Sequence, residues 1–114
     1  YIRAENNIFR NNTVGGIVMD GCPGTVTDMN VDLGGGLVDV HSACGMTSGP
    51  GTEPAASIGQ NTITGNTPID LNNACAQVEK AENNFWDHTT VADILTNDVS
   101  GSFDVDPLGV DINN

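Results

Sequence analysis

An asparagine followed two residues later by a large apolar residue recurs along this chain of 114 residues. The aligned stretches are ENNIFRNNT at 5–13, GQNTITGNT at 59–67 and AENNFWDHT at 81–89. They superpose Asn7, Asn61 and Asn84, and the last two of these are 23 residues apart. Asn30 also lies 23 residues after Asn7. A fixed period of this length is typical of repeat architectures, in which one unit stacks on the next.

The residues between the asparagines predict short strands and sharp turns. Apolar residues alternate with polar ones at Ile17 and Met19, and again at Ile69 and Leu71, which is the pattern of half-buried strands. We therefore expect an all-β fold, a parallel β-helix of about four to five coils in which each strand lies about 4.8 Å from its equivalent. The repeated asparagines suit tight left-handed corners, and equivalent asparagines can hydrogen-bond into a ladder.

The end of the repeat region predicts a cap. The last coil of a β-helix exposes apolar interior and strand edges unless something covers them, and Phe85 and Trp86 stand at that coil. The stretch 89–95 (TTVADIL) predicts a short C-terminal capping helix, with Thr90 as its N-cap and Asp93 as a capping-box acid. For Trp86 we favour packing in the core or cap over the alternative, a platform on which a sugar stacks.

The organisation that follows is a single domain over 1–114, with coils in 1–88 and the cap and tail in 89–114. The chain enters its first strand without a capping element. We expect the first coil to have an open edge that is covered either by the rest of a longer solenoid or by copies of the same chain.

The order of several short motifs resembles the C-terminal coils of right-handed parallel β-helix proteins, the pectin-lyase-like group of bacterial secreted and surface proteins. The motifs are VDLGGG at 31–36, GQNTITGNTPIDLNN at 59–73, AENNFW at 81–86 and FDVDPL at 103–108. The chain departs from the group at Asp87 and His88, where a glycine usually follows the tryptophan. The resemblance implies a right-handed coil, an extracellular or cell-surface location and a non-catalytic structural or adhesive scaffold that self-assembles or contacts polysaccharide. The alternative is the C-terminal part of a polysaccharide lyase or epimerase whose catalytic residues lie mostly elsewhere.

The charge balance restricts the possible partners. Three basic residues against fifteen acidic ones give a formal net charge of −12, which repels phosphate backbones and anionic membrane surfaces. We expect neither nucleic-acid binding nor membrane insertion, since no apolar run approaches the roughly 20 residues of a membrane span. Arg3, Arg10 and Lys80 are too few and too dispersed to form a basic cleft for an acidic polysaccharide.

The catalytic candidates are few. Asp39 and His41 in DVHSACG are at strand spacing, so their side chains would project from the same face as an acid and a base. His88 beside Asp87 is a second pair. The alternative is that both histidines are ordinary surface residues, and we expect no catalysis within this chain.

Metal binding is a further hypothesis. Asp104, Asp106 and Asp111 place carboxylates close together in the sequence, and Ca²⁺ prefers oxygen ligands. No EF-hand or Gly-rich calcium repeat accompanies them, so solvated acids are the alternative and no cofactor is required.

The sequence also offers candidates for two covalent modifications. Of the three cysteines, Cys22 and Cys44 are separated by about one repeat and could form a disulfide across neighbouring coils, or all three could be small buried apolar residues. Asn11 in NNT is the N-glycosylation candidate.

Overall fold

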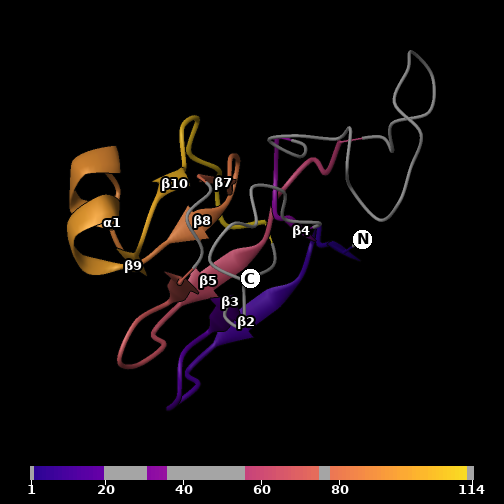
Figure 1. The fold of residues 1–114 in the computed structure, drawn as a ribbon. Helices are drawn as coiled ribbons and strands as arrows, with labels where there is room; N and C mark the ends of the chain where they lie inside the picture. The colour runs from indigo at the N-terminus through magenta and orange to yellow at the C-terminus, as the bar shows by residue number, and fades with distance from the viewer. Residues whose placement is uncertain (1, 20–30, 36–55, 75–77, 113–114) are drawn as a thin grey trace.

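A computed structural model describes residues 2–19, 31–35, 56–74 and 78–112. Ten short strands and one helix form these regions (Figure 1). The strands are β1 (Ile2–Arg3), β2 (Ile8–Arg10), β3 (Ile17–Met19), β4 (Val31–Asp32), β5 (Thr62–Thr64), β6 (Leu71–Asn73), β7 (Glu79–Lys80), β8 (Phe85–Trp86), β9 (Val99–Ser100) and β10 (Phe103–Asp104). The helix is α1 (Val91–Asn97).

The strands pair in parallel in four small sheets. Two sheets have three strands, in the orders β2-β5-β8 and β3-β6-β9, and two have two strands, β1-β4 and β10-β7. The register of the first sheet joins Phe9 to Ile63 and Ile63 to Trp86, the residues that the sequence alignment superposes. Figure 1 shows β2, β5 and β8 side by side with β2 at one edge.

The prediction of a right-handed parallel β-helix, and with it the resemblance to the pectin-lyase-like group, is wrong. The described strands belong to four separate sheets in a compact fold, and none of these sheets closes or curls into a coil. The physical reason is the length of the strands. Segments of two or three residues pair with their neighbours and then turn, so no sheet continues into the next.

Corners precede the strands of the first sheet. Asn6, Gln60 and Asn83 have positive φ angles of 58°, 60° and 60°, and each stands directly before one of the aligned asparagines. The residue before each aligned asparagine therefore takes the left-handed conformation. Asparagine, which fills two of these three positions, is several-fold enriched in this conformation over most residue types. The sequence had suggested this corner for the aligned asparagine itself, so the prediction was one residue out.

The core is a single cluster built mainly from single apolar residues of the strands. Its largest fully buried apolar members are Leu33, Ile63, Leu71, Trp86 and Ile94, each at most 2% exposed. Helix α1 adds Ile94 to this cluster. The predicted N-cap is confirmed, because the Thr90 hydroxyl accepts the backbone N–H of Asp93 at 3.1 Å.

Candidate functional site

A row of stacked asparagine side chains crosses the first sheet. Asn84 Oδ1 accepts both the backbone N–H of Asn61, at 2.9 Å, and the Nδ2 of Asn61, at 2.8 Å. Asn61 Oδ1 accepts the same two groups of Asn7, at 3.0 and 3.3 Å. Each carboxamide oxygen therefore satisfies two donors of the next chain segment, and the side chains hold the strands in register.

A second row repeats this chemistry at the other end of the strands. Asp70 Oδ1 accepts the backbone N–H and the Nδ2 of Asn66, at 2.9 and 2.7 Å. Asn66 Oδ1 accepts both groups of Asn12, at 3.0 and 2.8 Å. The alignment on Asn7, Asn61 and Asn84 did not predict this row. Asn12 and Asn66 do occupy the same place in the aligned stretches, and that correspondence is the signal that could have revealed it.

Both rows end beside β2. Asn61 and Asn66 are buried, whereas Asn7 and Asn12 are exposed. Among the described residues, no donor approaches the Oδ1 of Asn7 or Asn12. We call the segment 7–12 the β2 edge.

The backbone of the β2 edge has unused pairing groups. The carbonyl of Asn7 and the N–H of Asn11 bond to β5. Alternate residues of a parallel strand face the same neighbour, so the amide groups of Ile8 and Arg10 point away from β5. Within the described parts of the chain, β2 pairs with β5 alone. The side chain of Ile8 is 51% exposed, so this edge also carries apolar surface.

Three carboxylates converge where the second row ends at Asp70. One oxygen from each of Asp70, Asp87 and Asp98 lies within 4.8 Å of the other two. We call these residues the carboxylate centre. Asp70 and Asp98 are buried at 2% and 4% exposure, and Asp87 is exposed. Asp87 Oδ2 accepts the N–H of Gly65 at 2.7 Å, which ties the centre to the turn after β5.

The pKa values of two groups in and beside the carboxylate centre are raised. His88 Nδ1 lies 2.7 Å from Asp98 Oδ1, and this hydrogen bond raises the pKa of His88 and favours its cationic form. Burial raises the pKa of Asp70 to about 6 against the opposing hydrogen bonds from Asn66, and the nearby Asp87 carboxylate adds to the rise. Chemically, the centre can share a proton between Asp70 and Asp87. Its oxygens are also of the kind that a hard divalent cation prefers.

A further acid is buried elsewhere in the core. Glu79 on β7 is 2% exposed, and Asp32 on β4 is 1% exposed. Burial, followed by the charge of Asp32, raises the pKa of Glu79 to about 8. Glu79 is therefore largely protonated at neutral pH, which avoids two adjacent buried charges.

Asp104, Asp106 and Asp111, the calcium ligands that the sequence suggested, do not form a group of three converging carboxylates among the described residues. Asp104 Oδ1 accepts the N–H of Asp106, and Asp111 Oδ1 accepts the hydroxyl of Thr62. Only the carboxylate centre brings three acidic or metal-ligating side chains together within the described residues. Its members come from three separate segments without a local motif, so sequence spacing could not have found them.

Several other candidates lie outside the described residues, namely Asp39, His41, Asn30, Cys22 and Cys44. His88, the second acid–base candidate, bonds to Asp98 rather than to its sequence neighbour Asp87. Asn11 is exposed at a corner with a φ of 58°, and its glycosylation stays a prediction. Trp86 is 1% exposed, so its ring faces are not open for stacking on a sugar.

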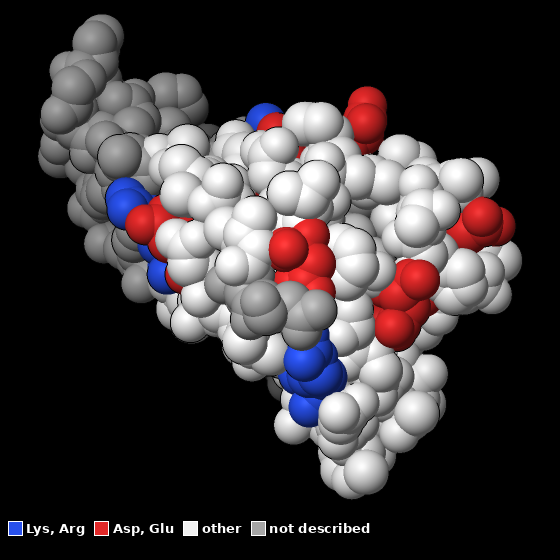
Figure 2. Space-filling model, turned by 180° about the vertical axis from the view of Figure 1, so that it is seen from behind, with Lys and Arg blue, Asp and Glu red and all other residues white. Residues whose placement is uncertain are grey.

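Basic residues do not gather on the surface that Figure 2 shows. Its basic side chains lie in separate spots rather than in one patch. Arg3 pairs with Glu5 at 2.8 Å, and Lys80 lies 3.4 Å from Glu82. Each of these two cations is therefore paired with its own carboxylate, and the two do not share a cleft.

Comparison with known proteins adds no relative. No protein-family model, no curated protein and no solved structure matches this chain. Within the described residues, the single helix is too short to cross a bilayer, and no candidate membrane span is present.

Proposed function

We propose that this chain is a non-catalytic structural scaffold of an extracellular or cell-surface protein, and that it assembles with further copies of itself by strand pairing at the β2 edge. The observation that carries the proposal is the exposed end of the two side-chain rows. Asn7 and Asn12 present the same oxygen that binds two donors in the buried members of each row. The β2 edge thus offers the groups that hold β5 to β8.

The use of the buried polar groups supports a structural function. Asn61 Nδ2 donates to Ala4 O and Leu33 O as well as to Asn84, at 3.0, 3.2 and 2.8 Å. Asn84 Nδ2 donates to Leu33 O and Ala81 O. These side chains join segments that are distant in the sequence, and the hydrogen bonds that they can form are used to hold those segments together.

Exposed strand edges are sites at which chains associate, because each offers a row of free N–H and C=O groups. The net charge of −12 opposes association between copies. At 0.1 M ionic strength the Debye length is about 10 Å, so salt largely screens the repulsion between exposed charges that are farther apart than this. Assembly should therefore strengthen as the salt concentration rises.

The test is light scattering on the purified chain at several protein concentrations, at low and at moderate salt. We expect the mass of the wild-type protein to rise with concentration, and to rise more at the higher salt. Ile8→Lys places a charge on the β2 edge and should keep the protein monomeric. Ile58→Lys is the matched control, because Ile58 is 52% exposed and Ile8 is 51% exposed.

A wild-type protein that stays monomeric under all conditions contradicts the proposal. Equal masses for the Ile8→Lys and Ile58→Lys variants would show that association uses another surface. The alternative function, part of a polysaccharide lyase or epimerase, rests on Asp39 and His41, and nothing among the described residues favours it.

A further inference from the structure

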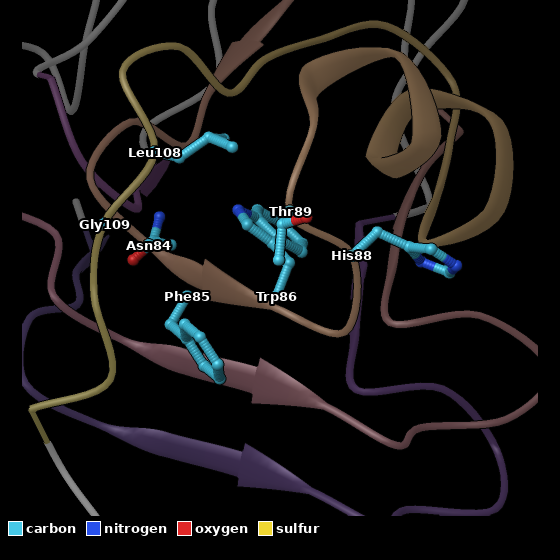
Figure 3. A pocket seen from close by; sticks show the side chains of 7 residues that line it. All are labelled: Asn84, Phe85, Trp86, His88, Thr89, Leu108 and Gly109. Carbon is cyan, nitrogen blue, oxygen red and sulfur yellow. The ribbon is translucent and has the colours of Figure 1, made fainter.

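A small pocket lies at the end of β8, next to the single tryptophan of the chain. Its volume is about 90 Å³. Trp86 and Leu108 supply apolar side chains and Thr89 supplies a hydroxyl group, whereas the ring of Phe85 points to the opposite side of β8 from Trp86 (Figure 3). The pocket is far smaller than the roughly 300–1,000 Å³ of sites that enclose a whole ligand, so it suits one substituent of a larger molecule.

The indole N–H of Trp86 is an unused donor at this pocket. Trp86 is 1% exposed, and its Nε1 is the one buried side-chain nitrogen or oxygen among the described residues that has no hydrogen-bond partner. In Figure 3 the nitrogen-bearing edge of the ring points toward Asn84 and Leu108, which line the pocket with it. A buried N–H without an acceptor costs about 1–3 kcal/mol, so an acceptor placed here is favoured.

The side-chain amide of Asn84 also lines the pocket, but it cannot bind an incoming group. Asn84 Oδ1 already accepts two hydrogen bonds from Asn61, and its Nδ2 donates two, to Leu33 O and Ala81 O. An incoming group therefore meets one free indole donor, the Thr89 hydroxyl and apolar walls. The net charge of −12 disfavours an anionic acceptor.

A larger hollow of about 430 Å³ adjoins the pocket and shares Leu108 and Gly109 with it. The exposed apolar side chains of Ile58 and Val110 lie along this hollow. A molecule resting there could place one substituent past Leu108 into the small pocket.

We propose that the Trp86 pocket binds the acetamido group of an N-acetylated sugar, with the sugar ring in the adjoining hollow. The group is neutral, its carbonyl oxygen accepts the indole N–H, and its methyl packs on Leu108. The Thr89 hydroxyl offers an acceptor to the amide N–H of the group. This site does not depend on strand pairing at the β2 edge.

The single tryptophan provides a direct test. In a ¹H–¹⁵N spectrum, the indole N–H of Trp86 gives one identifiable signal. We expect N-acetylglucosamine to move this signal downfield with a Kd on the order of 1 mM, as suits a ligand of this size. Glucose, which lacks the acetamido group, should leave the signal in place.

Two variants and a control locate the site. Leu108→Phe fills the pocket and should abolish the response, whereas Leu95→Phe on α1, 43% exposed in the wild type, should preserve it. Thr89→Val is an exposed substitution that should fold normally and raise the Kd several-fold. The proposal is overturned if N-acetylglucosamine does not move the signal, if glucose moves it equally, or if Thr89→Val responds as the wild type does while Leu108→Phe fails to fold.

Discussion

The two ends of the asparagine row differ in what lies beyond them. At one end Asn84 is fully buried, its backbone carbonyl accepts the N–H of Gly109 at 2.9 Å, and its amide is bonded to two further carbonyls. At the other end Asn7 is exposed, and no described group donates to its Oδ1. The same repeated residue is thus part of the core at β8 and part of the surface at β2.

The repeated sequence does not by itself determine which end of the asparagine row is covered and which end is exposed. At the β8 end, the segment that follows α1 returns over the strand, with Val105 1% exposed and Leu108 packed against the core. The described residues contain no equivalent cover for β2. An exposed strand edge with free N–H and C=O groups is a site at which chains associate.

The largest expected difference between the two ends concerns removal of an amide. Asn61→Ala deletes a fully buried side chain and leaves Ala4 O without its bond to Asn61 Nδ2. We expect a loss of about 2–4 kcal/mol in the free energy of unfolding, because buried polar groups would lose their partners. Asn7→Ala at the exposed end should cost less than about 1 kcal/mol. Urea denaturation of both variants measures the difference, and equal losses would contradict it.

A second test uses the pH dependence of stability. The pKa of Glu79 is raised from 4.5 to about 8, so the folded protein binds a proton that the unfolded chain releases. Its contribution is fully present below pH 4.5 and is lost as the pH rises through about 8. Asp70, raised from 3.8 to about 6, acts in the same direction at lower pH.

We therefore expect the melting temperature to fall between pH 5 and pH 8. Glu79→Gln should flatten the part of this fall that lies above pH 6.5. His88, whose pKa is also raised, remains in both proteins and so serves as an internal control. A melting temperature that rises with pH over this range would show that Glu79 is ionised in the folded state.

A smaller effect is expected at the helix of the covered end. Thr90→Ala removes the hydroxyl that accepts the Asp93 N–H and should cost about 1 kcal/mol. Thr13 is exposed near the β2 edge, and its replacement by alanine should change stability by less than about 0.5 kcal/mol. Thermal denaturation followed by circular dichroism compares the two. An unchanged Thr90→Ala variant would mean that the Thr90 hydrogen bond does not stabilise the folded protein.

The smallest effect is expected in the carboxylate centre. Asp87→Asn removes one charge beside Asp70 and keeps an oxygen that can accept the Gly65 N–H. The pKa of Asp70 should fall but stay above 3.8, because burial is the first cause of its rise. Carboxyl ¹³C titration in the presence of EDTA measures it. A pKa of Asp70 that does not move would show that the two carboxylates are uncoupled.

The sequence predicted local features better than their assembly. Recurrence of the asparagine predicted which residues of β2, β5 and β8 pair, because residues in register share one chemistry. The helix start at Thr90 was predictable, because a cap is a local hydrogen bond. The closure of the strands into coils was predicted wrongly, since strand spacing says nothing about whether separate sheets join.

The functional residues were harder to predict. The carboxylate centre unites Asp70, Asp87 and Asp98 from three segments, so no spacing rule marks it. The Trp86 pocket depends on residues that follow α1, above all Leu108, folding back against β8. Such contacts arise only from the complete fold.

The most direct test of the central claim is amide hydrogen exchange, resolved by residue and measured at low and at high protein concentration. If copies pair at the β2 edge, protection of the outward-facing amides of Ile8 and Arg10 should increase with concentration, while protection in β8 stays constant. Protection of Ile8 and Arg10 that is independent of concentration, or an increase confined to β8, would contradict the assignment of β2 as the assembling edge.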